Sequence, residues 1–276
     1  MMRFALALAA VAVAAAAFAA MPDPVSPDPN SPRPIEAVDS VFIEDLTWME
    51  IRDRMRAGVD TVIIATGGIE QNGPYIVTGK HNYILRGATE RIARKLGNTL
   101  VAPIVPFVPE GDLDPPSLHM KYPGTISLRE ETYEALLTDI CISFKTHGFK
   151  RLILLGDSGG NQAGMKAVAE KLNSTWGGSP HVVFVREFYD YGGLATWVEA
   201  QGVRQQPEGL HDDFVISAQL MAVDPETIRM QQRTKAGNFR INGIELAPME
   251  KSIEWGRRIL DYRAAQTVAA VRAASK

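Results

Sequence analysis

The sequence is poor in cysteine and shows no excess of basic residues. Cys141 is the only cysteine among 276 residues, so the chain cannot form an internal disulfide. A free thiol in an apolar stretch behaves as a small hydrophobic group. Lysine and arginine number 29 against 32 aspartates and glutamates, for a net charge of -3. Without a basic stripe we expect no nucleic-acid partner, and without a second long apolar run we expect no membrane association of the mature chain.

The N-terminal residues have the composition of an export signal. One arginine precedes an apolar run from Phe4 to Ala20, which ends in small residues. This pattern is typical of a secretory signal peptide, so we predict a signal peptide over 1–20 and a periplasmic or secreted protein. An uncleaved N-terminal anchor is the alternative, although the run is slightly short of the ~20 residues of a spanning helix. Residues 21–36 are proline-rich and are predicted to form a linker.

The remainder, residues 37–276, alternates between apolar runs and helical periodicity. This alternation predicts one α/β domain with a mainly parallel sheet flanked by helices. The strand candidates are Thr61–Ala65, Thr99–Val105, Arg151–Leu155 and His181–Val185. The helix candidates are Ile43–Arg56, Asn82–Leu96, Glu130–Thr146, Asn161–Asn173, Asp212–Ala222 and Met249–Ala274. Ligands bind at the carboxyl ends of such strands, so we expect the site in the polar loops 66–81, 106–124, 156–161 and 208–213.

The loop that follows the first strand carries two candidate functional residues, Glu70 and His81. A carboxylate in a glycine-rich turn is open to a ligand, although it could instead accept backbone N–H groups. His81 could supply a neutral imidazole to a metal, or could be an ordinary histidine at a helix start. Lys80 and Arg86 are interpreted as solvated charges at the start of the same helix, with a role in binding an anion as the alternative.

The string Gly156-Asp157-Ser158-Gly159-Gly160-Asn161 lies between a predicted strand and a predicted helix. It satisfies the G-x-S-x-G pattern of a nucleophile elbow, which requires this strand–turn–helix setting. Ser158 could then be a nucleophile, with Asp190 and His211 as its acid and base. A metal-binding turn is the alternative.

Three segments together resemble the creatininase (creatinine amidohydrolase) family. Residues 68–81 resemble its G-x-x-E-Q-H-G-P-H loop, residues 119–128 its H-x-x-F-P-G-T-I-S-L segment, and residues 156–161 its N-G-H-G-G-N turn. Glu208–Asp213 is similar to the acidic segment before a later helix of the family. The metal ligands differ, however. Glu70 is retained, Asp213 is a shorter carboxylate, and His81 replaces an aspartate. Asn72 and Ser158 stand at histidine positions and are poor zinc ligands.

The resemblance implies a homo-oligomeric hydrolase that acts on a non-peptide, possibly cyclic, C–N bond of a small molecule. It also implies a divalent metal, zinc or manganese. The predicted ligands are Glu70, His81, Asp157, His211 and Asp213, and the predicted catalytic residues are Glu70, His119 and Ser158. Two other hypotheses stay open, namely a metal-free serine hydrolase that uses Ser158 and a non-catalytic descendant that binds a small ligand.

Overall fold

The computed structural model describes residues 26–274 except 210 and 238. The predicted signal peptide over 1–20 and the first part of the linker lie outside the described residues. The contacts within the chain define one unit over Ala37–Lys276, separate from the residues up to Glu36. Among the helices of the described residues, none is both long and apolar enough to cross a membrane.

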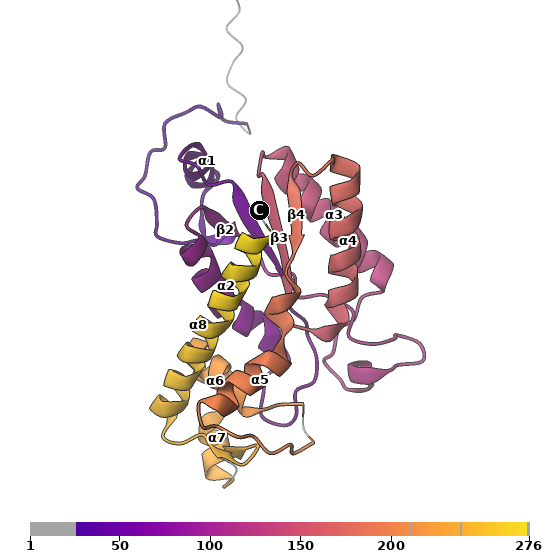
Figure 1. Ribbon diagram of the computed structural model, residues 1–276, viewed down its shortest axis with the longest axis vertical. Coiled ribbons are helices and arrows are strands. Elements are labelled where there is room, and N and C mark those ends of the chain that lie inside the picture. Colours follow the sequence, from indigo (N-terminus) through magenta and orange to yellow (C-terminus); the bar gives the residue numbers. More distant parts are fainter. Residues whose placement is uncertain (1–25, 210, 238, 275–276) are drawn as a thin grey trace, which may run out of the picture. The chain divides into compact units, whose positions relative to one another are not determined.

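A four-stranded parallel sheet lies at the centre of this unit, which confirms the predicted fold class (Figure 1). The strand order is β2-β1-β3-β4. The strands are β1 (Thr61–Thr66), β2 (Thr99–Val101), β3 (Arg151–Gly156) and β4 (His181–Phe184). β2 is shorter than predicted. Pro103 has no N–H to donate, so regular pairing stops before it, and only an isolated bridge between Thr66 and Val105 continues the edge.

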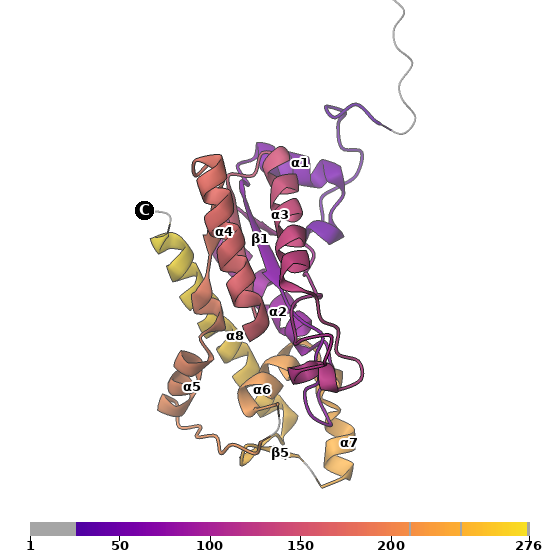
Figure 2. The same cartoon turned by 90° about the vertical axis from the view of Figure 1, so that its right-hand side faces the viewer.

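Helices cover both faces of the sheet, and alternate strand residues point into two separate cores. Ile63 and Ile153 pack toward α2 (Lys80–Leu96), α6 (Phe214–Val223) and α8 (Met249–Ala273). Val62 and Leu152 pack toward α3 (Glu130–Thr146) and α4 (Gln162–Trp176). Figures 1 and 2 show α3 and α4 on one face and α2 and α8 on the other. Burial on both faces explains why the strands read as continuous apolar runs rather than alternating ones.

The helix boundaries follow local capping chemistry. Thr47 and Glu50 form a capping box at the start of α1 (Trp48–Arg56). This cap separates α1 from a short 3-10 turn at Ile43–Asp45, which divides the single helix predicted over 43–56. Asp213 accepts the N–H of Ile216 at 2.6 Å and thereby caps α6.

Several short elements were not predicted. They are α5 (Tyr191–Ala200), α7 (Met230–Lys235), the hairpin of β5 (Arg240–Ile241) with β6 (Ile244–Glu245), and the 3-10 turns Leu118–Lys121, Gly159–Asn161, Arg186–Tyr189 and Pro225–Ile228. The last helix, α8, packs on α6 and α2. Gly256 makes the close approach to α6 possible, because a Cβ at this position would lie 1.8 Å from the Ala218 carbonyl oxygen.

Candidate active site

The polar loops at the carboxyl ends of the strands surround one cleft of about 1680 Å³. Residues from all four predicted loops line it, among them Glu70, Glu110, His119, Ser158 and His211. The expectation that these loops gather at one edge of the sheet is therefore confirmed. The cause is the parallel arrangement, which brings the carboxyl ends of β1 and β3 side by side.

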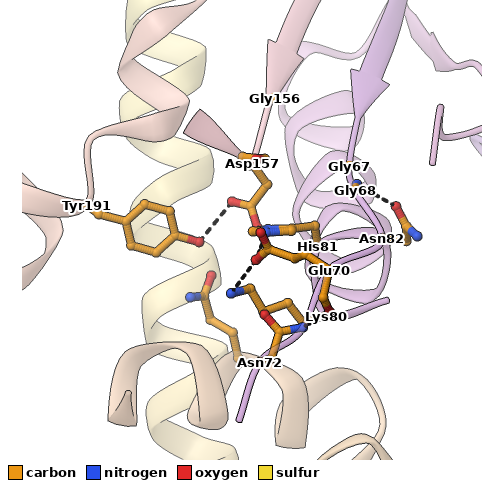
Figure 3. Close-up of polar contacts among 12 residues, drawn as sticks. Gly67, Gly68, Glu70, Asn72, Lys80, His81, Asn82, Gly156, Asp157 and Tyr191 are labelled. Carbon is orange, nitrogen blue, oxygen red and sulfur yellow. Dashed lines mark hydrogen bonds and ion pairs between the residues drawn. The ribbon is translucent and has the colours of Figure 1, made fainter. Parts of the chain in front are cut away.

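The loop after β1 is held by polar side chains of its own and of the helix that follows it. Asn72 is buried and donates from Nδ2 to the carbonyl oxygens of Glu70 at 2.9 Å and Val77 at 3.0 Å. Gly68 N–H donates to Asn82 Oδ1 at 3.4 Å (Figure 3). Asn72 therefore braces the loop that presents Glu70.

Glu70 contacts four other side chains of the cleft and is only 2% exposed. Its Oε1 atom lies 2.9 Å from each of three nitrogens, namely Lys80 Nζ, His81 Nε2 and His211 Nε2. Its Oε2 atom lies 3.1 Å from His119 Nε2. Burial opposes ionisation, but the hydrogen bonds from His211 and His81 and the charge of Lys80 hold the pKa of Glu70 well below its usual range. Glu70 is thus an ionised carboxylate on which the other groups converge.

Lys80 and His81 open α2 beneath this carboxylate. The interpretation of Lys80 as a solvated charge was wrong, because the residue is only 1% exposed, whereas Arg86 is solvated as predicted and pairs with Glu44. His81 lies between two carboxylates, with Nδ1 2.9 Å from Asp157 Oδ2 and Nε2 against Glu70 (Figure 3). Burial alone would lower the pKa of His81, but the bonds to Asp157 and Glu70 outweigh it and raise that pKa.

Asp157 anchors the far side of His81. The carboxylate is fully buried and accepts from Arg263 Nη2 at 2.6 Å and from the Tyr191 hydroxyl at 2.9 Å. Burial opposes ionisation, but the charge of Arg263 and the bond with His81 lower the pKa of Asp157 to about 2. Sequence reasoning missed Arg263. A signal was available, because this arginine shares the apolar face of the last helix with Leu260 and Thr267.

Glu110 is a second residue that sequence reasoning missed. It lies in the loop between β2 and α3, is buried, and accepts from the Ser158 hydroxyl at 3.2 Å through Oε2. Burial and the nearby charge of Glu70 raise the pKa of Glu110 to about 8. Within the described residues, Glu110 Oε1 has no hydrogen-bond partner.

Ser158, His211 and Asp190, the three residues considered for a serine hydrolase, each have a different hydrogen-bond partner. Ser158 is bonded to Glu110, and His211 is bonded to Glu70. Asp190 accepts the N–H of Gly193 at 2.9 Å and caps α5. Within the part of the chain that the structure describes, no hydrogen bond joins Ser158 to His211, so these three residues do not form the arrangement of a Ser–His–Asp triad.

Two groups of potential metal ligands share Glu70. The outer group consists of Glu70, His119 and His211, and the inner group of Glu70, His81 and Glu110. In each group the ligand atoms lie within 4.8 Å of one another. Asp157 and Asp213, both predicted as ligands, belong to neither group among the described residues, since one pairs with Arg263 and the other caps α6. His119, predicted to assist the substrate, lies in the outer group.

The outer group suits a divalent ion, because two imidazoles and one carboxylate are a common ligand set with room for further ligands. His119 and His211 face the cleft, with their ring centroids 4.5 Å apart. The inner group does not fit an ion as it stands, because Lys80 Nζ and His81 Nε2 both lie 2.9 Å from Glu70 Oε1. The outer group has the other oxygen of Glu70 available, since Oε2 lies 3.1 Å from His119 Nε2. The residues present therefore fit one ion on the cleft side of Glu70.

Fold and site together define a single-domain α/β protein with a histidine–carboxylate centre at the carboxyl edge of a parallel sheet. A model of the family described as "Creatininase: Creatinine amidohydrolase" matches residues 44–271. The chain belongs to this family, which confirms the resemblance seen in the sequence.

Individual relatives are more distant. A 3-dehydro-scyllo-inosose hydrolase from Thermotoga maritima is 29% identical over 125 residues, which cover 45% of this chain and 38% of the relative. A creatinine amidohydrolase from Pseudomonas putida is 28% identical over 116 residues, or 42% of this chain and 44% of the relative. The matched segments thus span less than half of each relative's own length. A solved structure titled "Creatininase Mn" superposes with a TM-score of 0.63 at 20% identity, over 85% of this chain and 98% of that one.

Proposed function

We propose that this protein is a metal-dependent amidohydrolase that cleaves a non-peptide, possibly cyclic, C–N bond of a small molecule. The observation that carries the proposal is the convergence of His119 and His211 on the buried carboxylate of Glu70, at the wall of a cleft large enough for a small molecule. Family membership supports the reaction class, and the name of the Pseudomonas putida relative describes this chemistry.

Glu70, His119 and His211 would hold one zinc or manganese ion. When bound, such an ion supplies Lewis-acid polarisation of a carbonyl group. The other residues of the cleft position these ligands. Asn72 braces the loop of Glu70, and Lys80 and His81 fix the orientation of its carboxylate.

Glu110 is our candidate for proton transfer. The Ser158 hydroxyl donates to Oε2 and orients the side chain, while Oε1 has no partner among the described residues. Its position beside Glu70 places it near the reacting atoms, where a carboxyl group can donate a proton to a leaving nitrogen. This role replaces the nucleophilic role considered for Ser158, which would orient Glu110 instead.

The proposal is tested by metal content and by hydrolysis of a panel of cyclic amides, lactams and cyclic ureas. We expect bound zinc or manganese in the purified protein and loss of that metal in Glu70→Gln. Glu110→Gln should keep the metal and lower kcat by ~10²–10⁴-fold, the usual contribution of a general acid or base. His147→Gln is the matched control, because His147 is exposed at the end of α3.

A protein that binds neither metal overturns the proposal. A protein that binds metal but hydrolyses no member of the panel, while one of these compounds raises its melting temperature, supports the non-catalytic alternative instead.

The proposal extends to location and assembly. The apolar run of residues 4–20 supports export with cleavage of a signal peptide, which mass spectrometry of the expressed full chain would measure. Membership of the creatininase family is the ground for expecting a homo-oligomer, which light scattering would measure. Retention of the first twenty residues contradicts the proposed cleavage, and a monomeric mass contradicts the proposed homo-oligomer.

A further inference from the structure

Lys80 occupies a place where a lysine needs an explanation. It is the first residue of α2, where the helix dipole disfavours a positive charge. Its N-cap, Gly79, offers no side-chain hydrogen bond. The side chain is nevertheless 1% exposed, and lysines are almost never buried unless they are paired. Lys80 thus places a positive charge at a helix N-terminus and buries a lysine, both of which are unfavourable. Such exceptions at a cleft are expected to have a function there.

The partner of Lys80 is the carboxylate that both ligand groups share. Nζ lies 2.9 Å from Glu70 Oε1, the same oxygen that His81 Nε2 contacts. His81 is fully engaged as well, because its Nδ1 atom lies 2.9 Å from Asp157 Oδ2. The inner group consists of Glu70, His81 and Glu110. An ion bound there would need Glu70 Oε1 and His81 Nε2 as ligands, but these two atoms already contact each other, and Lys80 Nζ contacts the same oxygen.

The charge of Lys80 also opposes metal binding in the inner group. A divalent ion beside an ammonium on one carboxylate oxygen, in a site shielded from water, is strongly repelled. Glu70 is nevertheless a buried carboxylate with Glu110 close beside it, and a positive charge next to it offsets the cost of burying its negative charge. Lys80 places its ammonium group 2.9 Å from Glu70 Oε1 as part of the chain, whereas a metal supplies a positive charge there only when bound.

We propose that Lys80 is the built-in cation of the inner ligand group and closes it to metal, so that the protein binds a single divalent ion through Glu70, His119 and His211. The part concerning the outer ion rests on the proposed function. The part concerning Lys80 does not, because it follows from the occupied inner group alone.

The experiment is a zinc titration of the full chain after removal of metal with a chelator, with bound zinc counted by elemental analysis after gel filtration. We expect one equivalent in the wild type. Lys80→Met has a side chain of similar length without the charge, and it should bind a second equivalent. The double variant Lys80→Met/Glu110→Gln should return to one, because it removes a ligand of the inner group. Lys166→Met, at an exposed position on α4, is the matched control and should bind one equivalent.

Two equivalents in the wild type overturn the inference, as does a single equivalent in a folded Lys80→Met. If the wild type binds none and Lys80→Met binds one that depends on Glu110, the inference about Lys80 holds and the proposed outer site fails. If no variant binds zinc, both fail. Lys80→Gln is the second variant should Lys80→Met not fold, as judged by circular dichroism, and the same counts decide.

Discussion

The buried ion pair between Arg263 and Asp157 ties α8 to the carboxyl end of β3, and its loss should be costly. The guanidinium also donates to the Phe188 carbonyl at 2.9 Å and to Gln219 Oε1 at 2.9 Å. We predict that Arg263→Met lowers the free energy of unfolding by about 3–5 kcal/mol, because it removes the guanidinium that is paired with the fully buried carboxylate of Asp157.

The lowered pKa of Asp157 gives a second measure of how much its partners stabilise the charged carboxylate in the folded state. A fall from 3.8 to about 2 corresponds to about 2–3 kcal/mol of stabilisation of the charged form. Because this pKa is lowered in the folded state, the stabilisation is present above pH ~4 and is lost as the pH falls toward ~2. In Arg263→Met the carboxyl protonates more readily, so the gap to the wild type should shrink as the pH is lowered.

Urea unfolding followed by circular dichroism at pH 7 and at pH 4 measures both effects. Arg257→Met is the matched control, since this arginine is exposed on the same helix, and it should change stability by less than about 0.5 kcal/mol. The double variant Arg263→Met/Asp157→Asn should lose less than the two single losses added together, by roughly 2 kcal/mol. A loss below about 1 kcal/mol for Arg263→Met, or fully additive losses in the double variant, would refute the reasoning.

Two further predictions concern helix packing and capping. Gly256→Ala places a methyl group against the Ala218 carbonyl and should cost about 1–3 kcal/mol, seen as a fall of several degrees in Tm. Gly192→Ala, where the added carbon meets nothing closer than 3.6 Å, is its control; equal melting temperatures would contradict the tight α6–α8 contact. Thr47→Ala removes the capping box with Glu50 and should cost about 1 kcal/mol in urea unfolding, and an unchanged midpoint would show that the cap contributes nothing.

Much of the fold could be predicted because its signals are local. Each strand of the parallel sheet was recognised as an apolar run, and α3 was predicted with its observed boundaries, since periodicity and flanking turns lie within a few residues of one another. The errors also have local causes. β2 stops at a proline, and the helix predicted over 43–56 is divided by the cap at Thr47.

The site was predicted less completely. Glu70, His119 and His211 were singled out from their loops, and the structure brings them together. Glu110 and Arg263 were missed, because a carboxylate or a guanidinium acquires its role from partners far away in sequence. Asp157 and Arg263, for example, are 106 positions apart.

The sequence by itself determined which segments along the chain form the main strands and helices, which loops carry the chemistry, and the family to which the chain belongs. These follow from hydrophobic periodicity and from short motifs, both of which are properties of neighbouring residues. Only the tertiary structure decided what each polar group does. It turned Lys80 from a surface charge into a buried partner of Glu70, and it made Asp157 an anchor for His81 rather than a ligand. The physical reason is that charge and hydrogen-bond partners act over a few ångströms in space, and folding alone sets those distances.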